Sequence, residues 1–271
     1  MDKKNKIKSI SKIAIKPNYL HKDEQKILAS IEATPYMQKT VVLVKDFVKK
    51  YVGKNEKLAY LAVFDEVFRI LNEAKTYVDD YLQKRKSNGE IKDEKQALKS
   101  IAGSSFSLTL VYIFLKNKEL GSIRNNIFIT SKTSKVPSFK DVSVINVDGE
   151  TQKPDCDLVI YSLNDDGTLK RCMILSLKTS LRERAGQTYK WKLLMEIAAS
   201  DNPIKEKYNI EYNPEKMPLV GFATVNFYNE INNPQHRGMF KFFDKSFIAK
   251  NVDTDFIARM STLPKYVNEN L

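Results

Sequence analysis

Two short segments of the chain carry the residues best suited to chemistry. The first contains Asp155 and Asp157 and leads into an apolar run, and the second, from Ser176 to Lys178, ends the next apolar run. Side chains alternate across a strand, so the two aspartates share one face, as do Ser176 and Lys178. A strand aspartate supplies the hard oxygen that a divalent cation prefers, and the backbone carbonyl of Leu177 offers a second one. Because Lys178 can orient a water or offset charge that develops on a phosphate, these residues predict metal-dependent phosphodiester hydrolysis.

The turn between the two apolar runs decides whether these side chains meet. The turn residues Asn164–Gly167 predict an antiparallel hairpin. A two-residue loop places Asp155 opposite Lys178 and Asp157 opposite Ser176, whereas a four-residue loop places Asp155 opposite Ser176. Both registers bring an aspartate and Lys178 onto one face. An exposed hairpin with an ordinary surface ion pair is the alternative interpretation.

A charged triplet, Arg182-Glu183-Arg184, begins four residues after Lys178. Arginine can donate two hydrogen bonds to guanine O6 and N7 in the major groove, and glutamate can accept one from cytosine N4. The triplet therefore predicts a reader of C:G pairs beside the cutting site. The alternative is a solvated start of a helix, where the glutamate suits the helix dipole but the arginines do not.

Together these residues resemble the PD-(D/E)xK superfamily of type II restriction endonucleases. Pro154-Asp155 matches the first motif, and Ser176-Leu177-Lys178 matches the second in the variant that has serine in place of the acid. The triplet matches the branch resembling EcoRII, PspGI and BsaWI. The resemblance covers roughly residues 95–230, and its specific part is residues 153–187.

The resemblance implies an enzyme that hydrolyses phosphodiester bonds in double-stranded DNA at a short palindrome with a CCGG-like core. It implies Asp155, Ser176 and Lys178 as catalytic residues, with Asp155 and the Leu177 carbonyl holding Mg²⁺, for which Mn²⁺ can substitute. It extends DNA recognition to Arg182, Glu183 and Arg184. A homodimer is expected because palindromic DNA has two-fold symmetry and two strands to cut. A higher oligomer on DNA is also compatible with this resemblance. It also implies a cognate methyltransferase in the same system, which need not contact this chain.

One position departs from the family pattern. A glutamate about thirteen residues after the lysine often completes the metal site in this branch, and here that position is Trp191. We expect Trp191 to lie in the core. The second acid is left open among four residues: Asp157, Gln187, Glu196 and Glu94.

The elements that must position these residues follow from hydrophobic periodicity. Helical spacing predicts helices within residues 22–86, from 92 to 120 and from 184 to 200, with a short one near 256–260. Strand-like runs cover residues 127–130, 142–147, 157–162, 171–178, 219–225 and 240–248. The predicted fold class is α/β (α+β), with an N-terminal helical domain (residues 1–90, a DNA clamp or dimerisation unit) and a nuclease core (residues 91–271) whose mixed central sheet is flanked by helices. The polar turn at Ser87-Asn88-Gly89 marks the predicted boundary.

Bulk composition agrees with a polyanionic partner. The net charge is +12 with a pI near 9.4, which favours phosphate binding through counterion release. The lysine-rich start is either a DNA-contacting arm or a solvated tail. Cys156 and Cys172 are too few for a disulfide framework and are expected to be buried thiols. The chain has no signal-peptide pattern and no long uninterrupted apolar stretch, so we expect a cytoplasmic protein without a membrane partner.

Two other functions fit the same residues. In a structure-specific or repair nuclease, the triplet would bind phosphates rather than bases. In a non-catalytic basic DNA-binding protein, the metal site would stay incomplete.

Overall fold

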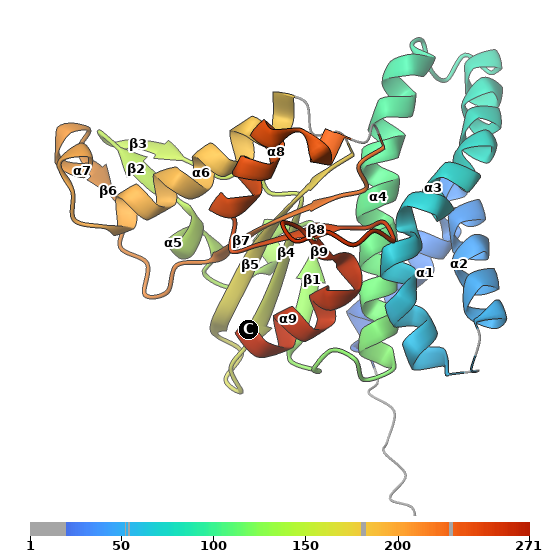
Figure 1. The fold of residues 1–271 in the computed structure, drawn as a ribbon, viewed down its shortest axis with the longest axis horizontal. Coiled ribbons are helices and arrows are strands. Elements are labelled where there is room, and N and C mark those ends of the chain that lie inside the picture. The colour runs from blue at the N-terminus through green and yellow to red at the C-terminus, as the bar shows by residue number, and fades with distance from the viewer. Residues whose placement is uncertain (1–19, 52, 54, 180–182, 228–229) are drawn as a thin grey trace, which may run out of the picture.

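The computed structural model describes residues 20–51, 53, 55–179, 183–227 and 230–271, and only the backbone of residues 183–185 and 187. A mixed central sheet lies between helices, with a long helical hairpin beside it (Figure 1). This arrangement confirms the predicted fold class of a mixed sheet flanked by helices.

The N-terminal part of the described chain is helical. Helix α1 (Lys22–Ala33) leads through a 3₁₀ turn (Pro35–Met37) to α2 (Gln38–Lys50), and α3 (Glu56–Ser87) and α4 (Glu94–Glu119) form the long hairpin. Both long helices begin at a side-chain cap: Asn55 accepts from the N–H of Leu58 at 3.1 Å, and Asp93 accepts from the N–H of Gln96 at 3.0 Å. Such caps satisfy backbone donors that have no partner within the helix.

Helix α4 is the central helix of the molecule. By length and composition it could cross a membrane, a test that buried core helices also pass. Its residues Phe106, Leu110 and Phe114 are less than 2% exposed and share one core with helices α1–α3 and the sheet. Because α4 packs on both sides within the protein, its apolar character reflects the core and does not indicate a membrane protein.

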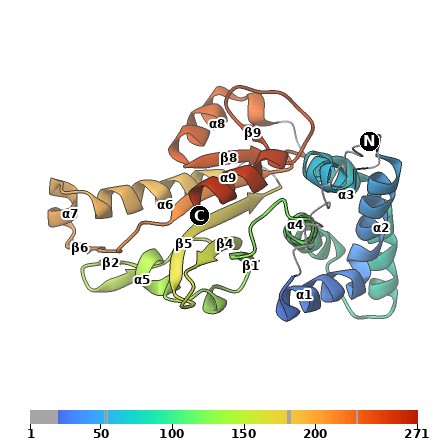
Figure 2. The same ribbon diagram turned by 90° about the horizontal axis from the view of Figure 1, so that it is seen from below.

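The sheet has six strands in the order β1-β4-β5-β7-β8-β9. Strands β1, β4 and β5 are antiparallel neighbours, and β5, β7, β8 and β9 are parallel neighbours. Their bounds are Ile127–Thr130 for β1, Leu158–Leu163 for β4, Leu169–Lys178 for β5, Leu219–Thr224 for β7, Lys245–Ile248 for β8 and Ala258–Arg259 for β9. Figure 2 shows α3 and α4 almost end-on at one side of the sheet, and α6 (Glu183–Ala199) extends toward the other side.

Alternation along β5 assigns its two faces. Met173, Leu175 and Leu177 belong to the core that includes α4, whereas Cys172 and Ile174 pack with α5 (Phe139–Ser143) on the opposite face. Ser176 and Lys178 therefore project from the face opposite α4.

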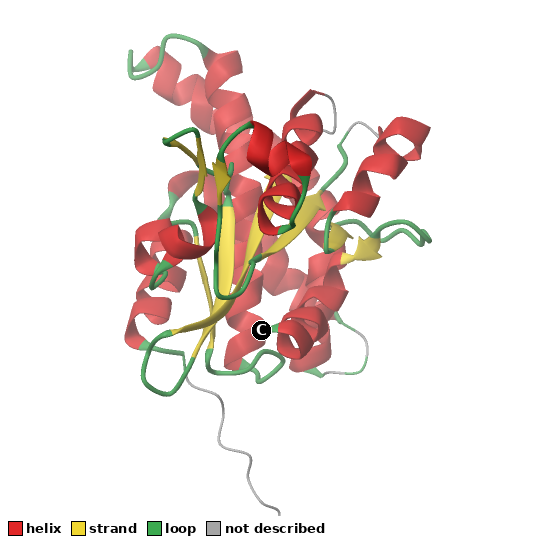
Figure 3. Ribbon diagram, turned by 90° about the vertical axis from the view of Figure 1, so that its left-hand side faces the viewer, coloured by secondary structure: helices red, strands yellow, loops and turns green. Residues whose placement is uncertain are grey.

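A smaller sheet is joined to the central one. It consists of β3 (Glu150–Gln152), β2 (Ile145–Val147) and β6 (Ile210–Glu211), paired in that order. The β2–β3 turn, Asp148-Gly149, has positive φ at both residues (50° and 82°), as a tight hairpin of this hand requires. Helices α7 (Pro203–Lys207), α8 (Pro234–Met239) and α9 (Leu263–Asn270) complete the described fold, and Figure 3 shows the yellow strands between the helices.

Three expected elements differ from the structure. The predicted strand at residues 142–147 is split, because Val142 and Ser143 end α5 and only Ile145–Val147 pairs. The run at 240–248 begins as a 3₁₀ turn (Phe240–Phe242) that places Phe240 in a second core cluster, and the strand starts at Lys245. The predicted helix near 256–260 is wrong, because Ala258–Arg259 pairs with β8 as strand β9. Short apolar runs do not distinguish helix from strand by periodicity alone.

The helical part and the sheet share packing across the predicted boundary. The turn after Ser87 separates α3 from α4, yet α3 also holds the C-terminal region through Asp65. Its carboxylate accepts from the backbone N–H of Ser261 at 2.9 Å and from the Ser261 hydroxyl at 2.7 Å. Burial raises the pKa of Asp65, and these hydrogen bonds oppose that rise. The division at residue 90 into two domains stays a prediction.

Candidate active site

The β4–β5 hairpin sets the register of the candidate site. Leu158 pairs with Leu175 in the ladder, and continuing this register places Asp157 across from Ser176 and Asp155 across from Lys178. This is the register expected of a two-residue loop. The loop itself is longer, because a β-bulge shifts the pairing to Leu163 with Leu169 at the turn end.

Lys178 and two aspartates form a compact ionic cluster at the end of β5. The Lys178 ammonium lies 3.1 Å from Oδ2 of Asp155 and 3.1 Å from Oδ2 of Asp157. The lysine side chain is 9% exposed, whereas Asp155 is 62% exposed and Asp157 33%. A buried ammonium needs anionic partners to offset its desolvation. The lysine is thus buried, and the more exposed carboxylates lie between it and the solvent from which a substrate would approach.

Asp157 also holds the backbone of β5. The N–H of Leu177 donates to Asp157 Oδ2 at 2.7 Å. The N–H and C=O of one strand residue point toward the same neighbour, so the Leu177 carbonyl is directed to the edge where the aspartates lie. The sequence analysis paired the Leu177 carbonyl with Asp155 as metal ligands, and this assignment stays a prediction, since the observed hydrogen bond joins Leu177 to Asp157.

A hydroxyl pair connects this cluster to helix α6. Ser176 Oγ lies 3.4 Å from Asp157 Oδ2 and 3.3 Å from Oγ1 of Thr188. Ser176 is 1% exposed and Thr188 is 4% exposed. Thr188 was not singled out from the sequence.

The donor set suits a small divalent cation. Among the described residues, Lys178 contacts Oδ2 of both aspartates and Leu177 contacts Oδ2 of Asp157, and none of these contacts uses an Oδ1 atom. Groups of three or more His, Cys, Asp or Glu side chains are absent from that part of the chain. Mg²⁺ commonly uses one or two carboxylates together with water and substrate phosphate oxygens, so two aspartates and a carbonyl fit this ion.

The neighbouring thiols do not contribute ligands. Burial, together with the negative charges of Asp157 and Asp155, raises the pKa of Cys156 to about 12. Burial likewise raises the pKa of Cys172 to about 12. Because the thiolate is the form that binds metals, neither cysteine is a metal ligand at neutral pH. Cys172 is buried, as expected, whereas Cys156 is only partly buried.

Two of the four candidate acids lie elsewhere. Glu196 is 3.3 Å from Lys192, which also pairs with Asp244 at 2.9 Å. Glu94 pairs with Lys86 at 3.4 Å, and the connection between α3 and α4 projects beyond the sheet (Figures 1 and 3).

The other candidates and Trp191 complete the comparison with the sequence. Asp157 is the acid brought to the lysine, whereas the side chain of Gln187 lies outside the described residues. Trp191 packs in the second core cluster, which confirms the expectation of a core residue.

The charged triplet adjoins the cluster along the chain. Arg182 lies outside the described residues, and for Glu183 and Arg184 the structure describes the backbone at the start of α6. Helix α6 begins within the triplet, at Glu183, and contacts Ser176 of β5 through Thr188, about one helical turn further along.

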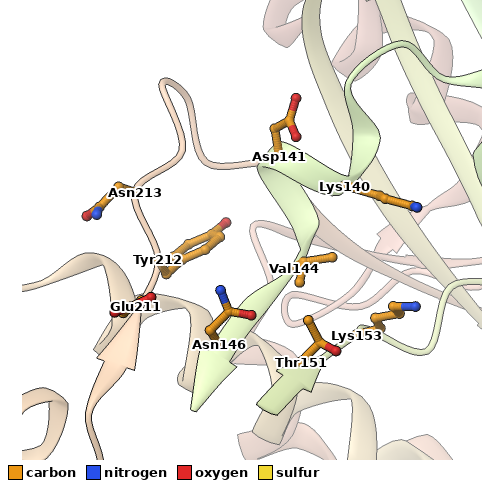
Figure 4. A pocket seen from close by; sticks show the side chains of 9 residues that line it. All are labelled: Lys140, Asp141, Val144, Asn146, Thr151, Lys153, Glu211, Tyr212 and Asn213. Carbon is orange, nitrogen blue, oxygen red and sulfur yellow. The ribbon is translucent and has the colours of Figure 1, made fainter. Parts of the chain in front are cut away.

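A groove of about 510 Å³ borders the carboxylate segment. It lies between α5 and the small sheet, and Lys153, two residues before Asp155, is part of its wall (Figure 4). Asn146 and Thr151 are cross-strand partners in that wall. Its lysines, Lys140 and Lys153, are balanced by acids, Asp141 and Glu211, so the groove is not a basic surface.

Comparison with known proteins identifies the class of enzyme. Residues 135–266 match the family model described as BsaWI restriction endonuclease type 2. The match covers just under half of the chain and includes both strands of the β4–β5 hairpin. The chain is a type II site-specific endonuclease, and its substrate is DNA. The matched region carries Asp155, Asp157 and Lys178.

Other comparisons add less. Among solved structures, the chain is similar to one described as a restriction endonuclease PspGI–substrate DNA complex, with 14% identity, a TM-score of 0.44, and coverage of 91% of this chain and 92% of that one. This similarity is too low for transferring residue roles or DNA contacts. No curated protein matches the chain.

Proposed function

We propose that Asp155, Asp157 and Lys178 form the cutting centre of a Mg²⁺-dependent restriction endonuclease. The observation that carries this proposal is the position of the Lys178 ammonium, 3.1 Å from a carboxylate oxygen of each aspartate. Such a cluster holds a cation-binding pair of acids and a positive charge on one solvent-facing edge.

Each residue has a distinct role in the proposal. Asp155 and Asp157 would hold Mg²⁺, or Mn²⁺ in its place, through their Oδ1 atoms, together with the Leu177 carbonyl. Bound Mg²⁺ supplies Lewis-acid polarisation of a phosphate and a lowered pKa for an attacking water. Lys178 places its charge where negative charge develops on the phosphate. Ser176 supports Asp157 instead of acting as a ligand, because its hydroxyl is buried and directed at that carboxylate.

The recognition word is the second part of the proposal. Arg182, Glu183 and Arg184 would read C:G pairs of a CCGG-like core in the major groove, since their donors and acceptor match guanine and cytosine edges. The start of α6 at Glu183 supports this role, because Thr188 of the same helix contacts the proposed cutting centre. Reading and cutting would then occur on adjacent base pairs.

The assembly follows from the substrate. A palindrome presents the same word on both strands, so a homodimer with one cutting centre per strand is expected. Higher oligomers on DNA are an extension of that arrangement. A cognate methyltransferase protects host DNA without needing to touch this chain, and both would act in the cytoplasm.

Cleavage mapping tests the proposal. Purified protein is incubated with unmethylated plasmids of varied sequence and Mg²⁺, and the fragment ends are sequenced. Discrete fragments that share a C:G-containing palindrome, and that vanish in Asp155→Asn, support it. Ends that follow junctions or nicks instead would indicate a structure-specific or repair nuclease, and intact DNA with tight binding would indicate a non-catalytic DNA-binding protein.

A further inference from the structure

The contact between Thr188 and Ser176 has a defined direction. A carboxylate only accepts hydrogen bonds, so Ser176 is the donor to Asp157 Oδ2. A serine hydroxyl has one proton, and that proton is committed to Asp157. Thr188 must therefore be the donor in its contact with Ser176, which orders the three groups as Thr188 to Ser176 to Asp157.

We propose that Thr188 is a positioning residue that couples the recognition helix to the metal-binding carboxylate. This inference rests on the proposed function, because it assigns Asp157 to the cation site. Thr188 lies in α6, five residues after Glu183 where that helix begins. A displacement of the helix start on DNA would move the Thr188 hydroxyl and, through Ser176, the carboxylate of Asp157.

The distances favour a connection that tightens on binding. Hydroxyl-to-oxygen hydrogen bonds usually measure about 2.7–2.8 Å, whereas these contacts measure 3.3 Å and 3.4 Å. In free enzymes such contacts are often long and shorten when the substrate is bound. A shift of α6 toward β5 by roughly half an ångström would bring the contact between Thr188 and Ser176 into the usual range.

Burial makes the connection specific. Ser176 and Thr188 are 1% and 4% exposed, so water does not readily replace either partner, and a lost donor leaves a buried acceptor unpaired. Asp157 Oδ2 also accepts from Leu177 and Lys178. Losing the Thr188 donor therefore changes the hydroxyl of Ser176, which is one of three donors that fix Oδ2 and, with it, the direction of Oδ1.

Thr188→Val removes the hydroxyl with little change in volume, and Thr188→Ser restores it. The matched control is Thr109→Val on α4, where the hydroxyl is fully buried and has no hydrogen-bond partner among the residues that the structure describes. Mn²⁺ binding by calorimetry is measured in all three variants and the wild type, in the presence of a palindromic duplex, and the Mg²⁺ concentration for half-maximal cleavage is measured in parallel.

The expected result is a loss of about tenfold in metal affinity for Thr188→Val, as seen when groups that orient metal ligands are removed. Thr188→Ser and Thr109→Val should stay within about twofold of wild type. An unchanged titration in Thr188→Val, or an equal loss in Thr188→Ser, overturns the inference. Should Thr188→Val not fold, Ser176→Ala interrupts the same connection and must show the same loss. If wild-type protein binds Mn²⁺ but cuts no DNA, the proposed function fails while the calorimetry still decides the role of Thr188.

Discussion

The backbone N–H of Leu177 donates to Oδ2 of Asp157 at 2.7 Å. This bond fixes the carboxylate before β4 against the last residues of β5, next to Lys178. Asp157 precedes the first residue of β4, and this hydrogen bond nevertheless holds its side chain against β5. The two motifs that are separated by a hairpin in the sequence thus form one site.

Replacing Asp157 with asparagine should abolish most of the cutting activity. Asparagine keeps the size and can still accept from the N–H of Leu177, but it removes a negative charge that faces both the cation and Lys178. We expect a fall in single-turnover cleavage rate on the order of 100-fold or more. Circular dichroism checks that the variant is folded. A rate within a few-fold of wild type would show that Asp157 is not part of the cutting centre.

A buried ion pair should dominate the stability of the helical part. Lys118 of α4 lies 2.6 Å from Glu24 of α1, with side chains 1% and 7% exposed, and burial lowers the pKa of Lys118. Glu24→Gln leaves the ammonium without its counter-charge and should lower the free energy of unfolding by about 3–5 kcal/mol. The control is Asp23→Asn, which removes a pair whose side chains are 79% and 74% exposed and should cost less than about 1 kcal/mol. Urea unfolding measures both, and equal losses would contradict the assignment.

The two cysteines should be chemically inert in the folded protein. With a pKa of about 12 for Cys156 and Cys172, roughly one thiol in 10⁴ is ionised at pH 8, against about one in ten for an ordinary exposed thiol. Alkylation by iodoacetamide at pH 8 should therefore be slow in native protein and fast in urea. Rapid labelling of native protein would show that the thiols are not buried as described.

The same thiols predict how stability changes with pH. Their pKa is raised on folding, so the folded state keeps protons that the unfolded chain releases above about pH 9. Their contribution is complete below that pH and is lost as the pH rises toward 12. The midpoint of urea unfolding should fall between pH 8 and pH 10, and a rise over that interval would contradict this account.

The sequence predicted the parts of the site that depend on alternation and turn chemistry. Side-chain alternation left two registers open, with Asp155 opposite either Lys178 or Ser176, and both placed an aspartate and Lys178 on one face. The observed register is the one that places Asp155 across from Lys178. The bulge at Leu163 was not predictable, because a longer loop and an offset in pairing compensate each other. The partner of Ser176 was also missed, since a contact between Thr188 and a strand depends on how α6 packs rather than on any local pattern. The small sheet likewise depends on β6 returning from residue 210 to pair with β2, which is a long-range contact.

Arg184→Lys should separate reading of bases from binding of phosphates. Lysine keeps the charge but loses the two parallel hydrogen bonds that arginine can make to guanine. We expect discrimination between the preferred palindrome and a site with one changed C:G pair to fall by about 1–3 kcal/mol, or roughly 5- to 150-fold. The salt dependence of DNA binding should stay nearly the same, because the number of charges is unchanged. Equal binding losses on all sequences with unchanged discrimination would assign Arg184 to the phosphates.

The most direct measurement is single-turnover cleavage of unmethylated DNA with Mg²⁺ by wild-type protein, Lys178→Ala and Lys265→Ala. Lys178 lies between two aspartates, whereas Lys265 is 80% exposed on α9 and pairs weakly with Glu269 at 3.8 Å. The account predicts discrete fragments from wild type and Lys265→Ala, and a loss of at least about 100-fold in rate for Lys178→Ala in folded protein that still binds DNA. Cleavage by Lys178→Ala at the wild-type rate would contradict the assignment of the cutting centre.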